Sequence, residues 1–545
     1  MYLEQIEIQG FRGINRLSVT LQQTTALIGE NTWGKTSLLR ALWSLLGQGE
    51  VPYQFVAEDF HCSADRAHPL CQQIHIILTF REYKPDIALH SERLSRLFPT
   101  WCKGRDNLHR IRYRARAELT SSGTIHSYHD FLDNQGRPIN VLDPLHYIHL
   151  LMLMNPVLRL RDARSGRDGE QPGFSEAWAQ QLADLSRRLL DENTTDMDSE
   201  QLVQGMEAIE HLVAHYLNHV PPIRYRPRSA REIVTKPTSL RGLSSLQEML
   251  HSSGGRPLQL AMAALGGALL NAHGDREIDP AARPIVILED PEARLHPTML
   301  ALAWGLLEQL PGQKIITTNS GDLLTSMPLG QIRRLVRQPE DTRAYALNEE
   351  QFSGEELRRI AFHVRLNRPM SLFARCWLLV EGETEIWLLS ELAAICGWNL
   401  RGEGVRIIEF AQCGAPPLIK AARDLGIGWH LLADGDQAGN KYAASVRSLL
   451  RGEPERPHLT VLPNQDIEHY LYHHGFEQVF RKEAGEMHLQ GLSASKIIER
   501  AINRRSKPGM ALCVVEAAEK EGGEQLPHLL RQLFEQIIGL ARRQS

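Results

Sequence analysis

Gly29-Glu30-Asn31-Thr32-Trp33-Gly34-Lys35-Thr36 is the stretch that decides the fold of the first half of this chain. Its two glycines, separated by four residues and followed by Lys and Thr, form the phosphate-loop pattern. The apolar run before it, Thr25 to Ile28, predicts a strand, and Ser37 to Trp43 predicts a helix. In that context the loop N–H groups converge on phosphate oxygens, Lys35 neutralises the outer phosphates and the Thr36 hydroxyl binds Mg²⁺.

The composition limits the class of protein. The 545 residues are enough for about two to four domains. Because 61 Lys and Arg face 65 Asp and Glu, contact with nucleic acid must come from local basic patches. The 7 cysteines lack CxxC spacing, which argues against a disulfide framework and a zinc site. Met1 to Ile8 alternates like a strand, and the longest apolar run, Leu258 to Leu270, is too short to cross a bilayer, so we expect a cytoplasmic protein.

Further elements of a nucleotide site follow later in the chain. Pro284 to Asp290 is an apolar strand that ends in two acids. Glu289 suits Mg²⁺ held through water, and Asp290 is placed to orient or deprotonate an attacking water. Ser253-Gly254-Gly255 precedes an apolar helix and is a second candidate anion cradle, and Lys314 to Ser320 is a strand with a polar end. We expect the phosphates of a nucleotide to contact Gly29 to Ser37 and Ser253, Gly254 and Gly255, with Mg²⁺ on Thr36 and Glu289.

A helical segment interrupts this part of the chain. Trp178 to Leu189 and Leu202 to Leu217 each place apolar residues on one helical face, which predicts an αα-hairpin. Because the hairpin interrupts an α/β domain, we expect it to pair with a second copy of the chain. The basic run after it, Ile223 to Arg231, is equally a candidate for a phosphate-backbone contact and for a solvated edge.

Four acids in the last third of the chain follow two apolar strands. Cys376 to Val380 runs into Glu381, with Glu385 on the next helix, and Trp429 to Ala433 runs into Asp434 and Asp436. Alternating strand and helix patterns here predict a parallel sheet, whose carboxyl ends meet in one crevice. Hard oxygen donors in such a crevice suit Mg²⁺ or Mn²⁺, and two such ions about 3.5–4 Å apart support phosphodiester hydrolysis.

The first group of motifs resembles the ABC-type ATPase heads of the RecF, SMC and OLD (overcoming lysogenisation defect) proteins. The resemblance implies that Gly29 to Thr36 is Walker A and Ser253 to Gly255 the signature turn. It also implies Glu289 as the Walker B acid, Asp290 as the catalytic carboxylate and Asn319 as the switch residue, in a dimer whose two heads enclose ATP. The chain departs from the pattern at Thr32-Trp33, in the Glu-Asp order of the acids and at Asn319, where His is usual. These departures predict slow hydrolysis.

The later acids resemble the TOPRIM module of topoisomerases, primases and OLD nucleases, and head plus TOPRIM is the OLD layout. The sequence from Gly10 to Leu17 is similar to the YbjD-like branch of that family. The resemblance adds an acid and a lysine after the DxD. These match Glu468, which would complete the second metal site, and Lys507, which would stabilise charge on the phosphate. Arg500, Arg504 and Arg505 are candidate contacts to the DNA backbone.

The resemblance implies an α/β fold with an ABC-type head, an inserted helical hairpin and a C-terminal TOPRIM domain with a Rossmann-like parallel sheet. The expected segments are 1–170 and 223–350 for the head, 171–222 for the dimerisation insert, 351–372 for a linker helix and 373–545 for TOPRIM with a helical tail. Ser353 and Glu356 form a candidate capping box for the linker helix.

The expected function is that of an ATP-regulated, metal-dependent DNA endonuclease, acting as a homodimer or higher homo-oligomer. The resemblance implies phage defence or DNA processing, with an accessory helicase left open. The main alternative is a non-cleaving RecF- or SMC-like ATPase in DNA repair, whose head needs no carboxylate module. A relaxase would need a tyrosine nucleophile, for which Tyr442, Tyr470 and Tyr472 qualify by position alone. A primase would need a template-binding module, and none is evident.

Overall fold

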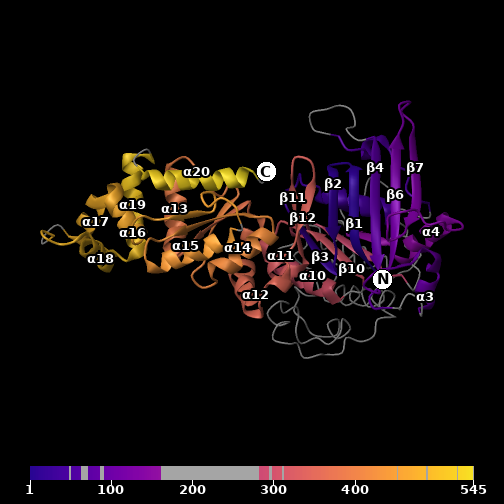
Figure 1. Cartoon of the computed structure of the whole chain (residues 1–545), viewed down its shortest axis with the longest axis horizontal. Helices are drawn as coiled ribbons and strands as arrows, with labels where there is room; N and C mark the ends of the chain where they lie inside the picture. Colours follow the sequence, from indigo (N-terminus) through magenta and orange to yellow (C-terminus); the bar gives the residue numbers. More distant parts are fainter. Residues whose placement is uncertain are drawn as a thin grey trace, which may run out of the picture. The chain divides into compact units, whose positions relative to one another are not determined.

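The computed structural model describes residues 1–47, 51–62, 72–85, 91–160, 282–293, 297–309, 312–450, 452–485, 489–523 and 526–543. The chain divides into two compact units, Met1–Ala346 and Leu347–Ser545 (Figure 1). The expected helical insert (171–222), the basic run (223–231) and Ser253, Gly254 and Gly255 lie outside the described residues. The expected linker segment, 351–372, falls within the second unit. No helix in the described ranges is long and apolar enough to span a membrane.

One sheet of the first unit is antiparallel, with strand order β2-β1-β4-β6-β5 and β7 paired to β6 (Figure 1). Its strands are β1 (Tyr2–Phe11), β2 (Ile14–Thr20), β4 (Gln73–Arg81), β5 (Cys102–Lys103), β6 (His109–Leu119) and β7 (Ile125–Leu132). Apolar residues alternate along each long strand and bury one face, so that Ile76 of β4 and Ala115 of β6 lie opposite each other within the core. β1 and β2 pair as an antiparallel hairpin that precedes the phosphate loop.

The second sheet of this unit carries the phosphate loop, and its order is β12-β11-β3-β10-β9-β8. Its strands are β3 (Thr24–Ile28), β8 (Val157–Leu160), β9 (Ile285–Glu289), β10 (Gln313–Thr317), β11 (Ile332–Arg337) and β12 (Thr342–Tyr345). All pairs are parallel except β11–β12, so the carboxyl ends of β3, β10 and β9 lie at one edge. Ile287 and Ile315 share a core with Leu38 and Leu42 of α1 (Lys35–Leu46), which follows the loop.

Shorter helical elements complete the first unit. They are η1 (Ala57–Asp59), α3 (Glu92–Ser95), η2 (Phe98–Thr100), α4 (Pro144–Met154), η4 (Pro291–Ala293), α10 (Pro297–Gln309), α11 (Gly321–Thr325) and η5 (Leu329–Gln331). Among them η4 and α11 matter most for the site, because η4 follows β9 directly and α11 follows β10.

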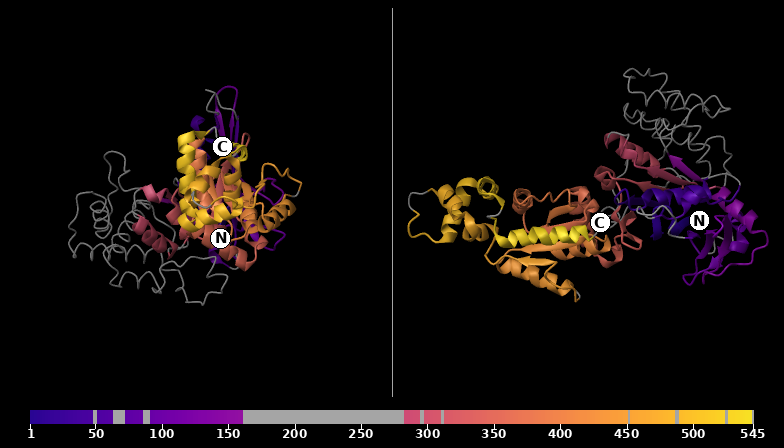
Figure 2. Two further views of the ribbon diagram at one scale, coloured as in Figure 1. Left: turned by 90° about the vertical axis from the view of Figure 1, so that its left-hand side faces the viewer. Right: turned by 90° about the horizontal axis from the view of Figure 1, so that it is seen from above.

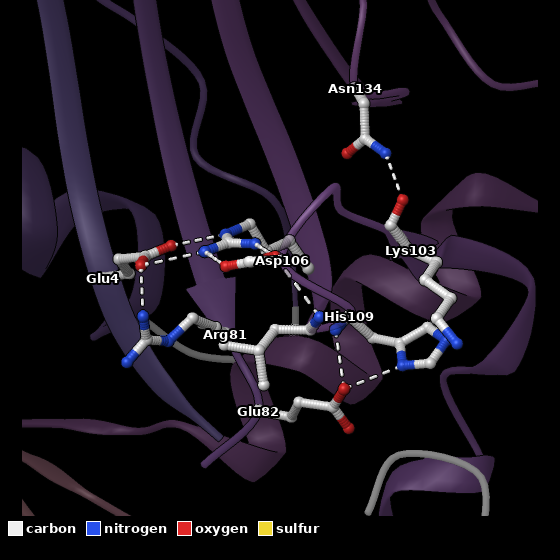
Figure 3. A network of polar contacts seen from close by, with 9 residues as sticks. Glu4, Arg81, Glu82, Lys103, Asp106, His109 and Asn134 are labelled. Atoms are coloured by element: carbon white, nitrogen blue, oxygen red, sulfur yellow. Dashed lines mark hydrogen bonds and ion pairs between the residues drawn. The ribbon is translucent and has the colours of Figure 1, made fainter. Parts of the chain in front are cut away.

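The face of the antiparallel sheet opposite the core carries alternating arginines of β6 that are matched by acids. Arg81 Nη1 donates to Glu4 Oε1 at 2.9 Å, and Arg110 Nε donates to Glu4 Oε2 at 2.6 Å, so one carboxylate of β1 joins β4 and β6 (Figure 3). Arg110 also pairs with Asp106 at 2.8 Å. Arg112 and Arg114 face Glu7 and Asp130. Because these charges cancel within the sheet, we do not assign this arginine row to DNA.

The second unit is built on a four-stranded parallel sheet of order β14-β13-β15-β16. Its strands are β13 (Cys376–Val380), β14 (Val405–Glu409), β15 (Gly428–Ala433) and β16 (Leu459–Val461). Cys376, Leu378 and Val380 share one core with apolar residues of the helices α13 (Glu383–Ile395) and α20 (His528–Arg542). Figure 2 shows α20 lying along the sheet, and it packs on β13, β15 and β14.

The remaining helices of this unit flank the sheet or extend beyond its carboxyl edge. They are α12 (Gly354–Ile360), η7 (Ala361–Leu366), η8 (Pro369–Phe373), α14 (Ala415–Asp424), α15 (Gln437–Leu449), α16 (Ile467–Leu471), η9 (Tyr472–Phe476), α17 (Glu477–Ala484), α18 (Ala494–Arg505) and α19 (Lys507–Glu521). The Ser353–Glu356 capping box is present at the start of α12. The helix continues into η7 as a π-turn, which the sequence did not indicate.

Candidate functional site

The phosphate loop leaves the carboxyl end of β3 and turns into α1 through two glycines that no other residue can replace without strain. Gly29 has φ 141° and Gly34 has φ 92°. A Cβ on Gly29 would lie 2.7 Å from the carbonyl oxygen of Leu335, and a Cβ on Gly34 would lie 2.9 Å from Ile14. The loop is therefore fitted closely against β11 and the β1–β2 turn. That turn also donates the N–H of Gly13 to Ser37 Oγ at 3.2 Å.

Lys35 is buried at the first position of α1, with its ammonium group held inside the loop. Its Nζ donates to the carbonyl oxygen of Gly29 and lies 3.4 Å from Asn319 Oδ1. Burial lowers the pKa of Lys35, while the carboxylates of Asp290, Glu292 and Glu30 oppose that shift. The predicted lysine and switch residue thus meet at the end of two neighbouring strands, although 284 positions of sequence separate them.

Trp33, the departure from the usual small residue of the loop, does not face the phosphate cradle. It is 3% exposed and belongs to the same core as Leu38 and Leu42. The guanidinium carbon of Arg334, on β11, lies 5.6 Å from the centre of the Trp33 ring. The Trp33 side chain therefore anchors the loop to the core. A tryptophan at this position is compatible with a phosphate loop.

The two acids after β9 point in different directions. Glu289 has the same strand parity as Ile285 and Ile287 and so lies on the face covered by α1, where it forms an ion pair with Arg159 of β8. Asp290 adopts a positive φ of 41°, and its N–H donates to the Thr317 carbonyl at 3.0 Å. Its Oδ1 is buried and, among the described residues, has no hydrogen-bond partner. Asp290 also contributes to the charge acting on Lys35.

Glu292 is a residue of this site that the sequence motifs did not select. Its Oε1 accepts the N–H of Asn319 at 2.5 Å, and its Oε2 accepts the hydroxyl of Thr318 at 2.9 Å. The available signal was a third acid in the turn after β9. Arg159 was missed for a different reason, since its place beside Glu289 depends on the pairing of β8 with β9.

The residues of this edge fit a nucleotide with Mg²⁺. The closely fitted loop, the buried Lys35 and the buried Asp290 oxygen that lacks a partner among the described residues match the charges of a phosphate chain and a divalent cation. Thr36 and Glu289 would hold the cation, as the sequence predicted. The signature turn, Ser253 to Gly255, lies outside the described residues and is not tested.

The second group of acids lies at the carboxyl edge of the parallel sheet. Glu381 follows β13, and Asp434 follows β15, which pairs with β13. Glu385, in the first turn of α13, folds back over Gly382, because a Cβ on Gly382 would lie 2.8 Å from Glu385 Oε2. Asp436 caps α15, and its Oδ1 accepts the N–H of Gly439 at 2.7 Å. Asp436 therefore has a structural contact besides any role in metal binding.

The carboxylates at this edge repel one another. Burial, reinforced by four neighbouring acids, raises the pKa of Asp434 to about 8. The four acids are Glu385, Glu381, Asp466 and Glu468. Burial also raises the pKa of Glu381, with further contributions from Asp436 and Glu385. A dense set of negative charges that raises its own pKa values is the electrostatic signature of a site built for a cation.

Glu468 and Lys507, the two weaker sequence assignments, lie in this cluster. Glu468 is buried on α16, and its Oε1 lies 3.1 Å from Lys507 Nζ. Burial opposes the charge of Lys507, but Glu468, Asp466 and Glu385 together raise its pKa. Asp466, two residues before Glu468, caps α16 and accepts His469 N–H at 2.8 Å.

The position of Lys507 is set by the junction between α18 and α19. Ser506 ends α18 with φ 69°, and its Oγ accepts the N–H of Gly509 at 3.3 Å, which caps α19. The chain thus changes direction at one residue, and Lys507 becomes the first residue of the next helix. A non-glycine residue at positive φ persists where its surroundings require it.

The acid cluster fits divalent cations by charge and by its unpaired oxygens. Within the described ranges, Glu381 Oε2 and Glu468 Oε2 are buried and lack a hydrogen-bond partner. The same ranges hold no closed group of three or more His, Cys, Asp or Glu already at ligand spacing. The acids therefore act on one another electrostatically but do not lie at ligand spacing. Their oxygen donors suit Mg²⁺ or Mn²⁺.

A row of basic side chains lies on α18, the helix that ends just before Lys507. Lys496, Arg500 and Arg504 are exposed and recur every four residues, which places them in one row. Among the described residues no ion pair occupies them, and Arg504 donates only to the carbonyl oxygen of Glu483 at 3.5 Å. Arg505, a predicted DNA contact, instead pairs with the Glu483 carboxylate at 2.6 Å.

Comparison with known proteins agrees with this architecture. A family model described as a protein of unknown function (DUF2813) matches residues 1–371, and a model described as an overcoming lysogenization defect protein-like TOPRIM domain matches residues 372–436. The uncharacterized protein YbjD of Escherichia coli (strain K12) is 44% identical over 552 residues, covering 99% of each chain. The chain belongs to the OLD family, in its YbjD-like branch.

Solved structures that match parts of this OLD-family chain have lower sequence identity. The C-terminal region of the Burkholderia pseudomallei OLD protein is 17% identical, with a TM-score of 0.27, and covers 31% of this chain and 99% of that one. The SMC head domain from Thermotoga maritima is 15% identical, with a TM-score of 0.29, and covers 64% and 100%. An SMC head bound to the C-winged helix domain of ScpA is 14% identical, with a TM-score of 0.35, and covers 64% and 99%.

The predicted fold class of this OLD-family member is confirmed. An ATPase head contains the phosphate loop, and a TOPRIM domain with a parallel sheet follows it. The TOPRIM model ends at Asp436, so Glu468 and Lys507 lie beyond the matched segment. Their place in the acid cluster comes from the structure alone.

Proposed function

We propose that this chain is an ATP-regulated DNA endonuclease that hydrolyses phosphodiesters with two divalent cations at its TOPRIM domain. The observation that carries the proposal is the gathering of five acids from three strand ends, which raises the pKa of Asp434 to about 8. A protein that only loads onto DNA has no need of so much uncompensated negative charge, because it repels the DNA backbone.

The acids and Lys507 have different roles in the proposed reaction. Glu381, Glu385, Asp434, Asp436 and Glu468 would hold the cations, which supply an activated water and neutralise charge on the leaving oxygen. Lys507 lies 3.1 Å from Glu468 and would donate to the phosphate oxygen that gains charge as the water attacks. Buried carboxylate oxygens that lack partners in the described part of the chain keep donors free for the cations.

We propose that the head uses ATP to control access to this site. Lys35 and the loop from Gly29 to Ser37 would bind the phosphates, and Thr36 and Glu289 would hold Mg²⁺. Asp290, whose Oδ1 has no partner among the described residues, would orient the attacking water. A homodimer or higher oligomer, in which heads pair across ATP, is proposed on the family resemblance. So are phage defence or DNA processing and a cytoplasmic location.

DNA is the proposed substrate because α18, which ends just before Lys507, carries exposed cations. The row Lys496, Arg500 and Arg504 rises about 6 Å between neighbours along α18 and leads toward Lys507. Such a row would offset the repulsion between the acid cluster and a phosphate backbone. Arg505 is excluded from the row by its pair with Glu483.

The proposal is tested by incubating supercoiled plasmid with the full chain and Mg²⁺ or Mn²⁺, with and without ATP. Asp434→Asn should abolish nicking while leaving ATP binding intact, and Lys35→Ala should abolish ATP binding. Retained metal-dependent nicking by Lys35→Ala would place chemistry and regulation in separate domains. Intact plasmid under every metal would overturn the nuclease and favour the non-cleaving RecF- or SMC-like ATPase.

A further inference from the structure

Glu292 stands out because both oxygens of its carboxylate are bound to the end of β10. Oε1 accepts the backbone N–H of Asn319 at 2.5 Å, and Oε2 accepts the hydroxyl of Thr318 at 2.9 Å. Thr318 is fully buried, and its Oγ1 accepts the N–H of Ser320 at 3.0 Å. One side chain from the turn after β9 thus binds both the Thr318 side chain and the backbone of Asn319.

The turn that carries Glu292 is itself tied to the same strand end. Asp290 turns the chain with its positive φ, and its N–H donates to the carbonyl of Thr317 at 3.0 Å and lies 3.2 Å from Thr317 Oγ1. Ala293 N–H donates back to the Asp290 carbonyl at 3.0 Å, which closes η4. The segment Asp290–Ala293 therefore joins the end of β10 at two points, one through the backbone and one through the Glu292 carboxylate.

These contacts fix the backbone of Asn319 and so the position from which its side chain extends. Its Oδ1 lies 3.4 Å from Lys35 Nζ, so Asn319 and the loop lysine face the same space. Ser320, the next residue, caps α11 by accepting the N–H of Leu323 at 3.2 Å. Asn319 is held on one side by this cap and on the other by Glu292, with its amide left to face Lys35.

We propose that Glu292 is a positioning residue of the ATPase site, which holds Asn319 where its amide can contact the outer phosphate beside Lys35. The inference rests on the proposed ATPase function and deepens it. Glu292 is poorly suited to be the base that activates water, because both of its oxygens already accept hydrogen bonds. Asp290 keeps Oδ1 without a partner in the described ranges and stays the better candidate for that role.

A carboxylate suits this positioning role better than a neutral group. Hydrogen bonds to an ionised acceptor are about twice as strong as neutral ones, and two of them fix both the distance and the direction of the turn. Glutamine would keep one acceptor oxygen and place a second donor where Thr318 or Asn319 already donates. Alanine would remove both contacts and release Asn319.

The test compares ATP turnover and nucleotide affinity in Glu292→Ala, Glu292→Gln and Asn319→Ala full-length proteins, with Glu118→Gln on β6 as the control. Glu292→Ala should lower kcat by about tenfold or more and leave the dissociation constant for ATP within about twofold, because only the aligned state is lost. Glu292→Gln should recover part of the loss. The double variant Glu292→Ala/Asn319→Ala should be no slower than Asn319→Ala, since both act through one contact.

Three results would overturn the inference: wild-type kcat in Glu292→Ala, equal losses of affinity and kcat without recovery in Glu292→Gln, or multiplied losses in the double variant. The melting temperature of each protein separates these outcomes from unfolding. Absence of ATP hydrolysis by the unmodified chain, with Mg²⁺ and DNA present, would overturn the ATPase proposal as well. Normal hydrolysis with an unaffected Glu292→Ala would overturn the role of Glu292 alone.

Discussion

Arg159 of β8 donates through Nε to Glu289 Oε1 of β9, although 130 positions of sequence separate the two residues. Arg159 is buried and Glu289 is partly exposed. The acid proposed to hold Mg²⁺ is thus engaged by a fixed cation. Mg²⁺ must displace that cation or share the carboxylate with it.

We therefore expect Arg159→Gln to lower the Mg²⁺ concentration needed for half-maximal binding of an ATP analogue. Loss of a fixed competing charge should shift the midpoint by about tenfold or more, because one charge-assisted hydrogen bond contributes about 1.5–3 kcal/mol. Equilibrium binding titrated with Mg²⁺ measures the shift, with exposed Arg16→Gln as the control. A higher Mg²⁺ requirement in Arg159→Gln would mean that the arginine orients Glu289 instead of competing for it.

Lys507→Ala should reduce plasmid cleavage by about 10²–10³-fold, the usual cost of removing one donor to a developing negative charge. DNA affinity should change little, because one phosphate contact is lost from several. Gel-based cleavage and a fluorescence-anisotropy titration separate the two effects. Lys520→Ala, exposed on the same helix, is the control, and an unchanged cleavage rate in Lys507→Ala would remove the lysine from the reaction.

The stability of the metal-free protein should fall as pH rises from about 4 to about 8. Asp434 has a folded pKa of about 8, above its unfolded value of about 4, so the folded state keeps the proton longer. Below pH 4 Asp434 does not lower the free energy of unfolding, and above pH 8 its destabilising effect is complete. Mg²⁺ should restore the melting temperature at high pH by neutralising the cluster.

Asp434→Asn supplies the matched variant for that pH profile. An amide cannot ionise, so the melting temperature of the metal-free variant should change less between pH 5 and pH 8.5 than that of the unmodified chain. Differential scanning fluorimetry in both proteins, with and without Mg²⁺, provides the comparison. Identical pH profiles would show that Asp434 is not the group that titrates.

Replacing Lys496, Arg500 and Arg504 together by alanine should weaken DNA binding. It should also make the binding less dependent on salt concentration, because phosphate contacts are lost. Each phosphate contact contributes about 0.7–0.9 to the slope of log K against log salt, so the triple variant should lose about 2 to 3 units. Binding isotherms at several salt concentrations measure the slope. Arg481→Ala is the control, because Arg481 is paired with Glu477 at 2.7 Å, and an unchanged slope in the triple variant would move the DNA path elsewhere.

Trp33→Ala should destabilise the first unit by about 3–5 kcal/mol, the cost of emptying a buried tryptophan site. The substitution gives the loop a small residue of the kind usual at this position, so an interpretation of Trp33 as a nucleotide contact predicts no loss of stability. Thermal unfolding decides between the two. Trp387→Ala, at a site 38% exposed, should cost much less.

The sequence predicted those parts of the sites that depend on short motifs. Walker A and the acids Glu381 and Asp434 each follow an apolar strand, and a parallel sheet brings strand ends to one edge. Lys35 and Asn319 were expected at one site because the resemblance implies a Walker A lysine and a switch residue there, and they lie 3.4 Å apart. The prediction of the acids needed only the position of each strand end.

Other features depended on pairings that no local pattern reveals. Arg159 reaches Glu289 only because β8 pairs with β9, and Arg505 is removed from the DNA row by Glu483 on another helix. The position of Glu292 beside Thr318 and Asn319 depends on the turn at Asp290, whose positive φ the sequence does not indicate. The burial of Trp33 was hidden as well, because a residue in a phosphate loop can face either the ligand or the core.

Ser506 has a consequence for how the TOPRIM domain tolerates changes in length. Because it is the single left-handed residue between two helices, it sets the rotational phase of Lys507 relative to α18. Deleting one residue from α18 would swing the helix end by about 100° and carry the ammonium group away from Glu468. Insertions are tolerable in the loops. The number of residues between the buried Ile498 and Lys507, in contrast, must stay the same for Lys507 to reach Glu468.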